Sequence, residues 1–371
     1  MTPVASTPVS VITGFLGSGK TTLLNHVLAD SRMAGAAVII NEFGEIGLDH
    51  LLVTTPAENM VLLRSGCLCC TIRGDLVETL ADLYRKRANS EIPPFDRVLV
   101  ETTGLADPVP ILRTVVTDEE LSSLFRLDSV ITLVDCVHAN TQLDANPESV
   151  KQAALADVLV LSKTDIARQQ DVRALGSRLM RINPGALQLA AVRGAIDCTA
   201  LFGHTPHHSG AAAGLTESWL AEAAFRGAAH QHDGHHEHHA PDVNRHDVHI
   251  RAFCLRYEPP VSGTGLLAWL NLLAGLRGAN LLRVKALVNV DGRPVVVHAV
   301  QSVIHEPIVL DAWPSEDHST RVVFIVRDMD RSEAERTLKL FELDSVKRTP
   351  GAMIDPQEYE RFVQAAAGLR P

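Results

Sequence analysis

The eight residues from Gly14 to Thr21, which read G-F-L-G-S-G-K-T, limit what this chain can fold into more than any other segment. They follow an apolar run typical of a strand, Val9–Thr13, and precede a run typical of a helix, Lys20–Ser31. Glycines at these spacings let backbone N–H groups turn toward phosphate oxygens, and the helix N-terminus adds a partial positive charge. The segment therefore predicts a phosphate loop, whose expected nucleotide contacts are Gly14, Gly17, Ser18, Gly19, Lys20, Thr21 and Thr22.

The chemistry expected at this loop needs a cation, a magnesium ligand and a carboxylate. Lys20 is expected to reach the β- and γ-phosphates, and Thr21 to offer its hydroxyl to Mg²⁺. The apolar run Val98–Val100 delivers Glu101 at its carboxyl end, where it would orient the attacking water or contact the magnesium shell. Gly104 follows, and its N–H is expected to meet the γ-phosphate. Lys20 and Glu101 are thus the catalytic candidates.

A third segment, Leu159–Asp165, predicts the base. Asp165 comes just after an apolar run and is expected to accept two hydrogen bonds from the guanine N1–H and exocyclic amine. Adenine lacks this donor pair, so a preference for GTP over ATP of about tenfold to a hundredfold is expected. Lys163 belongs to the same expected site, as does Ser162, which stands where Asn is usual.

Three thiols within four residues predict a soft-metal site. Cys67, Cys69 and Cys70 suit Zn²⁺, Cu⁺ or Co²⁺, and one cluster alone leaves a fourth ligand to come from elsewhere or stay open for exchange. Glu42 and Glu45 are candidates to add oxygen ligands. A structural metal site, a redox pair and inert buried thiols remain the alternatives. The other three cysteines are scattered, which is no disulfide framework and indicates a reducing compartment.

A second candidate metal-binding feature, this one made of histidines, lies between residues 204 and 247, a segment rich in Ala, Gly and His. Neutral imidazoles on such a segment bind Zn²⁺, Ni²⁺, Cu²⁺ or Co²⁺ loosely, which suits capture or buffering. The alternative is a solvated linker without a function of its own. The candidate loose ligands are His232, His235, His236, His238 and His239.

The order of apolar runs predicts an α/β fold in two parts. Up to Phe202, short β-like runs alternate with amphipathic stretches, as in a mostly parallel sheet. After the histidine-rich segment, adjacent strands such as those joined by Asp291-Gly292 predict a smaller antiparallel α+β domain. We therefore expect a phosphate-loop GTPase domain over residues 1–203, a linker or loop over 204–247 with a short helix at Glu217–Phe225, and a carboxyl-terminal domain over 248–371.

Charge and hydropathy argue against two classes of partner. The formal net charge is −10, with no long Lys/Arg run, so binding to nucleic acid or to an anionic membrane is not expected. The most apolar helix candidate, Leu266–Leu276, is too short to cross a bilayer. Met1–Ser10 lacks the basic residues of a secretory signal, and a cytoplasmic protein is expected.

The order of the motifs suggests that nucleotide and metal are coupled. The loop around Glu42 and the cysteine cluster lie between the phosphate loop and Glu101, in the stretch that responds to the γ-phosphate in a phosphate-loop GTPase. If one loop touches both ligands, each changes the affinity of the other by the same factor. Hydrolysis would then release the metal to a client.

The combination of G-F-L-G-S-G-K-T-T, N-E-F-G-E-I-G-L-D, G-C-L-C-C, E-T-T-G and S-K-T-D resembles the CobW-type metallochaperone GTPases, a family that includes nitrile hydratase activators and zinc-transferring GTPases. The resemblance covers nearly the whole chain. It implies a GTP-dependent metal insertase with Mg²⁺ at the phosphate loop, Glu101 at the magnesium and water position, and Asp165 on guanine. It also implies a metal site at Cys67, Cys69 and Cys70. Ser162 in place of Asn departs from the commonest form.

The function expected is therefore a low-turnover GTPase that binds Zn²⁺ or Co²⁺ and transfers it to a client metalloprotein, which the carboxyl-terminal domain recognises. One alternative is a metal-buffering or storage protein with a vestigial GTPase. Another alternative is a kinase of small metabolites, but this function would not explain the three clustered thiols.

Overall fold

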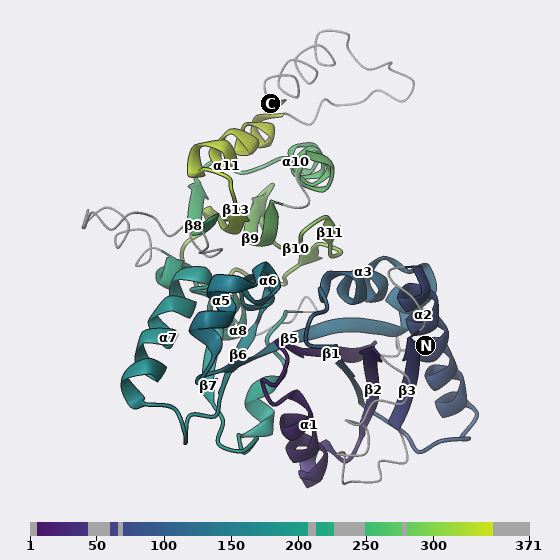
Figure 1. Ribbon diagram of the computed structural model, residues 1–371. Helices are drawn as coiled ribbons and strands as arrows, with labels where there is room; N and C mark the ends of the chain where they lie inside the picture. Colours follow the sequence, from purple (N-terminus) through teal and green to yellow (C-terminus); the bar gives the residue numbers. More distant parts are fainter. Residues whose placement is uncertain are drawn as a thin grey trace.

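The computed structural model describes residues 6–43, 60–65, 70–206, 213–225, 249–276 and 280–343. Their elements form two sheets with helices packed on them (Figure 1). The first sheet lies in the amino-terminal part of the chain and carries the motifs. The second lies in the carboxyl-terminal part and packs against α6 (Pro147–Leu155), which lies between the two.

The first sheet has seven parallel strands in the order β3-β2-β4-β1-β5-β6-β7. These parallel ladders confirm the mostly parallel α/β sheet expected from the sequence. In chain order the strands are β1 (Thr7–Gly14), β2 (Ala36–Phe43), β3 (Met60–Ser65), β4 (Arg97–Glu101), β5 (Phe125–Asp135), β6 (Val158–Ser162) and β7 (Leu187–Ala190).

Both faces of this sheet are covered because its central strands are apolar on both sides. Val11 and Val100 pack in the core that includes α2 and α3, whereas Ile12 and Leu99 pack in the core that includes α1. Figure 1 shows α1 on one face and α2 and α3 on the other. The helices are α1 (Lys20–Ala29), α2 (Cys70–Ala88), α3 (Val109–Thr117), α4 (Glu119–Leu124), α5 (Ala139–Ala145), α6 and α7 (Gln169–Ile182).

The second sheet is antiparallel, with the order β11-β10-β9-β13-β8 and β12 paired to β10. Asp291 and Gly292 join β9 to β10 with φ of 49° and 87°, the two positive values that a tight two-residue hairpin turn requires. The elements of this part are β8 (Ile250–Tyr257), α10 (Gly263–Leu276), β9 (Leu281–Val290), β10 (Arg293–Val300), β11 (Val303–Ile304), β12 (Ile308–Val309), β13 (Thr320–Arg327), α11 (Arg331–Thr337) and the 3₁₀ helix η5 (Leu338–Glu342).

Strand β9 is buried on both faces, and its alternation separates two environments. Val284 and Ala286 pack with Trp269 of α10 in the core of the second part. The intervening side chains, Arg283 and Lys285, face the first part and bond to groups near the end of α6 and on α8 (Ala213–Leu220). The junction between the two parts is therefore lined by buried charges.

The described section of the histidine-rich segment is packed. Instead of one helix over Glu217–Phe225, the chain forms α8 and a further helical turn at 222–225. Trp219, Leu220 and Phe225 are buried in the large core. The candidate ligands His232, His235, His236, His238 and His239 lie outside the described residues.

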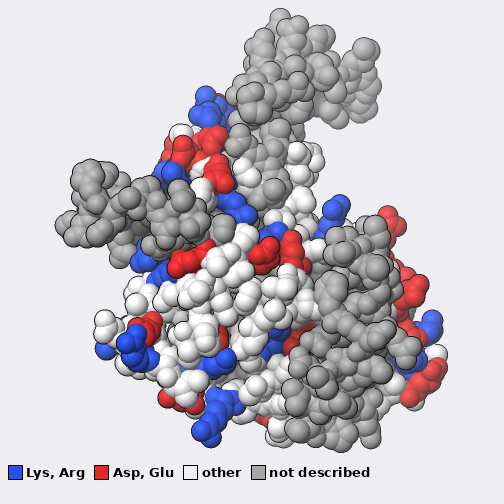
Figure 2. Space-filling model, viewed as in Figure 1, with Lys and Arg blue, Asp and Glu red and all other residues white. Residues whose placement is uncertain are grey.

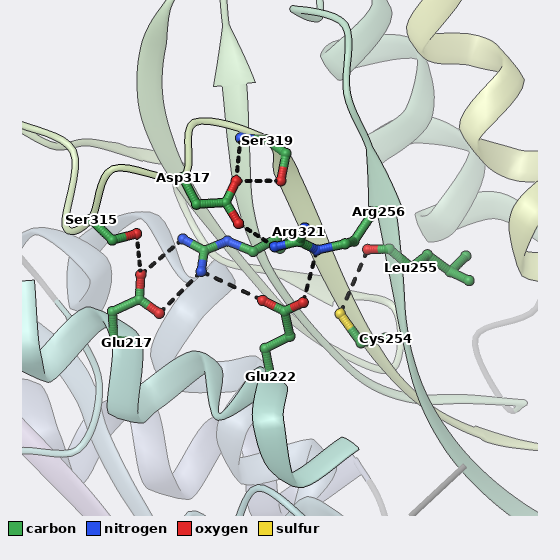
Figure 3. Close-up of polar contacts among 9 residues, drawn as sticks. All are labelled: Glu217, Glu222, Cys254, Leu255, Arg256, Ser315, Asp317, Ser319 and Arg321. Carbon is green, nitrogen blue, oxygen red and sulfur yellow. Dashed lines mark hydrogen bonds and ion pairs between the residues drawn. The ribbon is translucent and has the colours of Figure 1, made fainter. Parts of the chain in front are cut away.

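An ion-pair cluster fastens α8 and the turn after it to the second sheet (Figure 3). The Arg321 guanidinium, on β13, donates to both oxygens of Glu217, at 2.9 and 3.1 Å. It also donates at 3.5 Å to Glu222, which accepts a second bond from Arg256 of β8 at 2.9 Å. Asp317 pairs with Arg256 as well. Residues that precede and follow the candidate ligands His232–His239 in the sequence are thus joined directly.

The described surface is mixed in charge. On the face drawn in Figure 2, Lys and Arg side chains are interspersed with Asp and Glu and form no extended basic area among the coloured atoms. None of the helices in the described ranges combines the length and the apolar character that a membrane span requires.

Candidate functional site

The phosphate loop connects β1 to α1 as the motif predicts, and its first glycine is required by a close approach. Gly14 has φ of 138°, and a Cβ there would lie 2.4 Å from the Leu133 carbonyl oxygen of the neighbouring strand. The Lys20 ammonium is buried and donates to the carbonyl oxygens of Gly14 at 2.9 Å and Phe15 at 3.3 Å. The loop therefore curves around its own lysine, and this is the geometry of a phosphate cradle.

The carboxylate expected beside the loop lies there. Glu101 is the last residue of β4 and pairs in register with Ile12 of β1. Its Oε1 accepts a hydrogen bond from the Thr21 hydroxyl at 3.4 Å, and the carboxylate is buried. A hydroxyl and a carboxylate are oxygen donors that suit Mg²⁺. The buried hydroxyls of Ser18, in the phosphate loop, and Thr103, two residues after Glu101, have no hydrogen-bond partner among the described residues. The donor set therefore fits a hydrated magnesium ion and phosphate oxygens.

Gly104 brings the segment after β4 into contact with the phosphate loop. A Cβ on Gly104 would lie 2.6 Å from the Leu16 backbone nitrogen, so a larger residue would push the two segments apart. Leu16 and Leu105 are both exposed. The predicted γ-phosphate contact and the phosphate loop are therefore adjacent.

Ser162, at the end of β6, bonds to the phosphate loop. Its hydroxyl donates to the Ser18 carbonyl oxygen at 2.7 Å and lies 3.3 Å from the Val134 carbonyl oxygen. A shorter side chain than Asn thus still ties the segment expected to bind the base to the segment expected to bind phosphate.

Lys163 follows with φ of 58°, and its ammonium lies 2.7 Å from the carboxylate of Asp135 at the end of β5. Burial raises the pKa of Asp135, but hydrogen bonds from Lys163, His138 and the Val137 N–H outweigh it and hold this pKa below its ordinary value. Asp135 is therefore ionised at neutral pH, and its contact with Lys163 fixes the segment that leads to Asp165.

Asp165 lies beside a turn that no motif indicated. The guanidinium Nε of Arg193 lies 3.8 Å from its carboxylate. Arg193 and Gly194 both have positive φ, and a Cβ on Gly194 would lie 2.7 Å from the Thr22 carbonyl oxygen. The turn is thus packed on α1 next to the phosphate loop. A cavity of about 450 Å³ opens here, lined by Thr21, Thr22, Asn25, His26 and Arg193.

The predicted metal site is only partly described. Glu42 lies in β2 and Cys70 is the first residue of α2. Cys67, Cys69 and Glu45 lie outside the described residues. Because β3, β2, β4 and β1 are parallel neighbours, the ends of β2 and β3 share one edge with the phosphate loop. Within the described ranges, no group of three or more Cys, His, Asp or Glu side chains could hold a metal.

The scattered cysteines Cys136, Cys198 and Cys254 are buried and form no disulfide with one another. Burial raises the pKa of the Cys136 and Cys198 thiols to about 11, so both are protonated at neutral pH. They are poor metal ligands and poor nucleophiles in this state.

The geometry defines a phosphate-loop nucleotide-binding protein of the parallel α/β class. Comparison with known families identifies the family within this class. The profile described as the CobW/HypB/UreG nucleotide-binding domain matches residues 8–189, and that of the cobalamin synthesis protein CobW carboxyl-terminal domain matches residues 250–342. The chain belongs to the CobW family that these two profiles describe, and the resemblance seen in its motifs is confirmed.

Individual relatives agree with this assignment. The chain is 41% identical over 202 residues to a protein named zinc chaperone YjiA from Escherichia coli, a match covering 54% of this chain and 62% of that protein. It is 28% identical to one named zinc chaperone CobW from Pseudomonas aeruginosa, covering 91% and 92%. A match at 32% identity to the zinc-regulated GTPase metalloprotein activator 1 of Schizosaccharomyces pombe covers 51% of this chain and 47% of the relative.

A solved structure supports the whole fold. The crystal structure of Zn(II)-bound YjiA GTPase from E. coli superposes with a TM-score of 0.63 at 26% sequence identity, over 99% of this chain and 100% of that one. The match includes both parts of the chain.

Proposed function

We propose that this chain hydrolyses GTP to GDP and phosphate at a low intrinsic rate, and uses the reaction to control the transfer of zinc, or cobalt, to a client metalloprotein. The observation that carries the proposal is the meeting of three motif segments at one sheet edge, where the Thr21 hydroxyl lies 3.4 Å from the Glu101 carboxylate and Ser162 bonds to Ser18. Intrinsic rates of roughly 10⁻⁴ to 10⁻² s⁻¹ are expected, as for unassisted GTPases.

Each residue in the nucleotide site has a proposed role. Gly14, Gly17, Gly19 and Thr22 contribute backbone contacts to phosphates, and Lys20 neutralises charge on the β- and γ-phosphates. Thr21 and Glu101 hold the hydrated Mg²⁺, which supplies charge stabilisation when bound. Asp165 recognises guanine, with Lys163 beside it. Gly104 donates its N–H to the γ-phosphate.

Zinc, or cobalt, is the proposed cargo, held by Cys67, Cys69, Cys70 and Glu42. Two relatives are named zinc chaperones, which favours zinc. The end of β3, where the cysteine run begins, is three strands from β1, or roughly 14 Å at the usual spacing between strands. This distance is too long for the metal and the nucleotide to share ligands directly. Coupling between the two sites would therefore pass through the segment that follows Glu42.

The proposed division of labour follows the two parts of the chain. Residues 1–203 would bind nucleotide and metal, residues 248–371 would recognise the client, and the histidines of 204–247 would capture metal loosely. The expected location is the cytoplasm, where thiols stay reduced.

The test is a metal competition assay with Zn²⁺ and Co²⁺ in the presence of Mg²⁺ and a GTP analogue, GDP or ATP. Wild type should bind one equivalent tightly, with an affinity that differs between the GTP analogue and GDP, and a Cys67/Cys69/Cys70 triple Ala variant should lose this equivalent. Equal affinity in both nucleotide states would remove the coupling. Comparing Lys20→Ala with Cys69→Ala separates delivery from buffering, because buffering survives the first change and delivery is lost in both.

A further inference from the structure

Gln152 lies on the buried side of α6 and belongs to none of the motifs. It is 1% exposed, and its Nε2 donates to two backbone carbonyl oxygens, those of Gly104 at 3.3 Å and Ala106 at 3.1 Å. Both carbonyls belong to the segment Thr103–Ala106, which closes with a turn from the Ala106 N–H to the Thr103 carbonyl. One amide thus holds two points of the turn that directly follows Glu101.

The helix that carries Gln152 is itself fixed at several points. The Thr132 hydroxyl donates to the Gln152 backbone carbonyl at 2.9 Å. The Asn183 amide donates to the carbonyl oxygens of Ala153, Ala154 and Ala156 at 2.8–3.1 Å, which caps the carboxyl end of α6. The Gln152 side chain therefore projects from a rigid support.

A second, more exposed link joins the same helix to the same loop. The Lys151 ammonium pairs with the Asp107 carboxylate at 2.5 Å, and Asp107 also accepts from the Val109 N–H at the start of α3. Gly104 in turn lies against Leu16 of the phosphate loop, so closely that a Cβ added at Gly104 would clash with the Leu16 backbone. The chain of contacts therefore runs from α6 through the Gly104 turn to the phosphate loop.

We infer that Gln152 is a positioning residue for GTP hydrolysis, which fixes the Gly104 turn so that its N–H is oriented toward the γ-phosphate. The inference rests on the proposed GTPase function and deepens it. A buried amide whose two donor hydrogens meet two carbonyls of one turn restrains that turn more than an apolar side chain of the same size, which fills space without fixing an orientation. Because GDP has no γ-phosphate, the effect is confined to the triphosphate state.

The test compares Gln152→Met, which keeps side-chain volume and removes the donors, with Asn183→Leu, which removes the buried amide that follows α7 and caps the carboxyl end of α6, away from the Gly104 turn. For each, dissociation constants for a non-hydrolysable GTP analogue and for GDP are measured with Mg²⁺, together with kcat and KM. Gln152→Met should weaken binding of the GTP analogue and lower kcat about tenfold each, because two carbonyl oxygens of the turn lose their buried donor, while GDP affinity stays within twofold. Asn183→Leu should lower the melting temperature and leave the GTP-to-GDP ratio unchanged.

Lys151→Met is not expected to unfold the protein by disrupting its core, because the Lys151 ammonium lies near the surface. It should shift the GTP-to-GDP ratio in the same direction by a smaller factor. Equal losses for GTP analogue and GDP in Gln152→Met, or an unchanged ratio in both α6 variants, would overturn the inference. Absence of GTP hydrolysis in wild type would instead refute the proposed function, so the two failures are distinct.

Discussion

Buried polar groups form two clusters, one on each side of α6. The clusters differ in whether the chain itself supplies the partners of these groups. At the ends of β1 and β4, Lys20 and Glu101 stand beside the buried hydroxyls of Ser18 and Thr103, which have no partner among the described residues. At the junction with the second sheet, the Asp157 carboxylate is surrounded by the chain's own Arg283 and Lys285. The first region has unpartnered hydroxyls at the edge where the strands end. In the second region the charge of Asp157 is neutralised within the chain, although Arg283 Nε and both ring nitrogens of His298 also lack a hydrogen-bond partner among the described residues.

This difference separates binding from folding. A site that a ligand completes can lose a side chain at small cost to stability, because the empty site already tolerates unpaired groups. A buried pair that the chain completes leaves an uncompensated charge when one partner is removed. Neighbouring His298 and His305 add no charge to the junction, because burial lowers the pKa of both imidazoles, that of His305 to about 4. Variants in the two regions should therefore change different observables.

The largest effect is expected at the junction. Arg283→Ala removes the guanidinium that bonds to Asp157 and to the Leu155 carbonyl, and leaves the buried carboxylate with Lys285 and the Val130 N–H. The free energy of unfolding should fall by about 3–5 kcal/mol, measured by urea denaturation. The control is Arg251→Ala, whose pair with Asp330 is exposed and worth about 0–1 kcal/mol. Similar losses in both variants would show that burial of the junction is not what makes the pair matter.

The nucleotide site should give the opposite pattern. Lys20→Ala removes the buried ammonium of the phosphate loop, and GTP hydrolysis should fall at least about a hundredfold while the melting temperature changes little. Steady-state phosphate release and thermal unfolding of the same sample measure both. Lys86→Ala is the matched control, since its ammonium pairs with Asp82 on the exposed side of α2. Hydrolysis that persists in Lys20→Ala would place the chemistry elsewhere.

The charge state of the junction can be read from its pH dependence. Burial and the adjacent Arg283 lower the pKa of Lys285 to about 7, and Asp157 opposes them. Between about pH 7 and the ordinary value of 10.5, the unfolded chain binds a proton at this lysine that the folded chain does not. Stability should therefore rise with pH through this window, with a slope that approaches about 1.4 kcal/mol per pH unit.

The variant Lys285→Met isolates this contribution. From pH 7.5 to 9, wild type should gain about 2 kcal/mol relative to the variant in urea denaturation, because groups titrating in both proteins cancel. Parallel curves would mean that Lys285 is charged in the folded protein across this range. Below pH 7 the two curves should run parallel, since the lysine is then protonated in both the folded and the unfolded states.

The first of these regions could be predicted from the sequence because its residues end strands. Gly14, Glu101 and Ser162 each close an apolar run, and the carboxyl ends of parallel strands share one edge. The spacing of each motif thus fixes its place without knowledge of side-chain contacts. The start of α2 at Cys70 could not be located in this way, since Thr71, Ile72 and Gly74 are weak helix formers.

The second region gave no such signal. Arg283 and Lys285 occupy alternate positions of an apolar strand, a pattern typical of a solvent-facing side, yet that side packs on α6 and α8. Gln152 likewise reads as an ordinary polar residue of an amphipathic helix. Contacts between a side chain and a distant backbone carbonyl follow no spacing in the sequence, so the support behind the site emerges only from the structure.

The smallest effect is expected where the nucleotide site supports itself. Ser162→Ala removes the hydroxyl that donates to the Ser18 carbonyl oxygen at 2.7 Å. One neutral hydrogen bond contributes about 1 kcal/mol, so affinities for GTP and GDP should fall together by about fivefold, since the phosphate loop binds both. Isothermal titration with each nucleotide measures this, and Ser177→Ala, whose hydroxyl is exposed on α7, is the control. A loss confined to guanine nucleotides, with ADP and ATP binding unchanged, would instead assign Ser162 to base recognition, and the phosphate loop would then not depend on it.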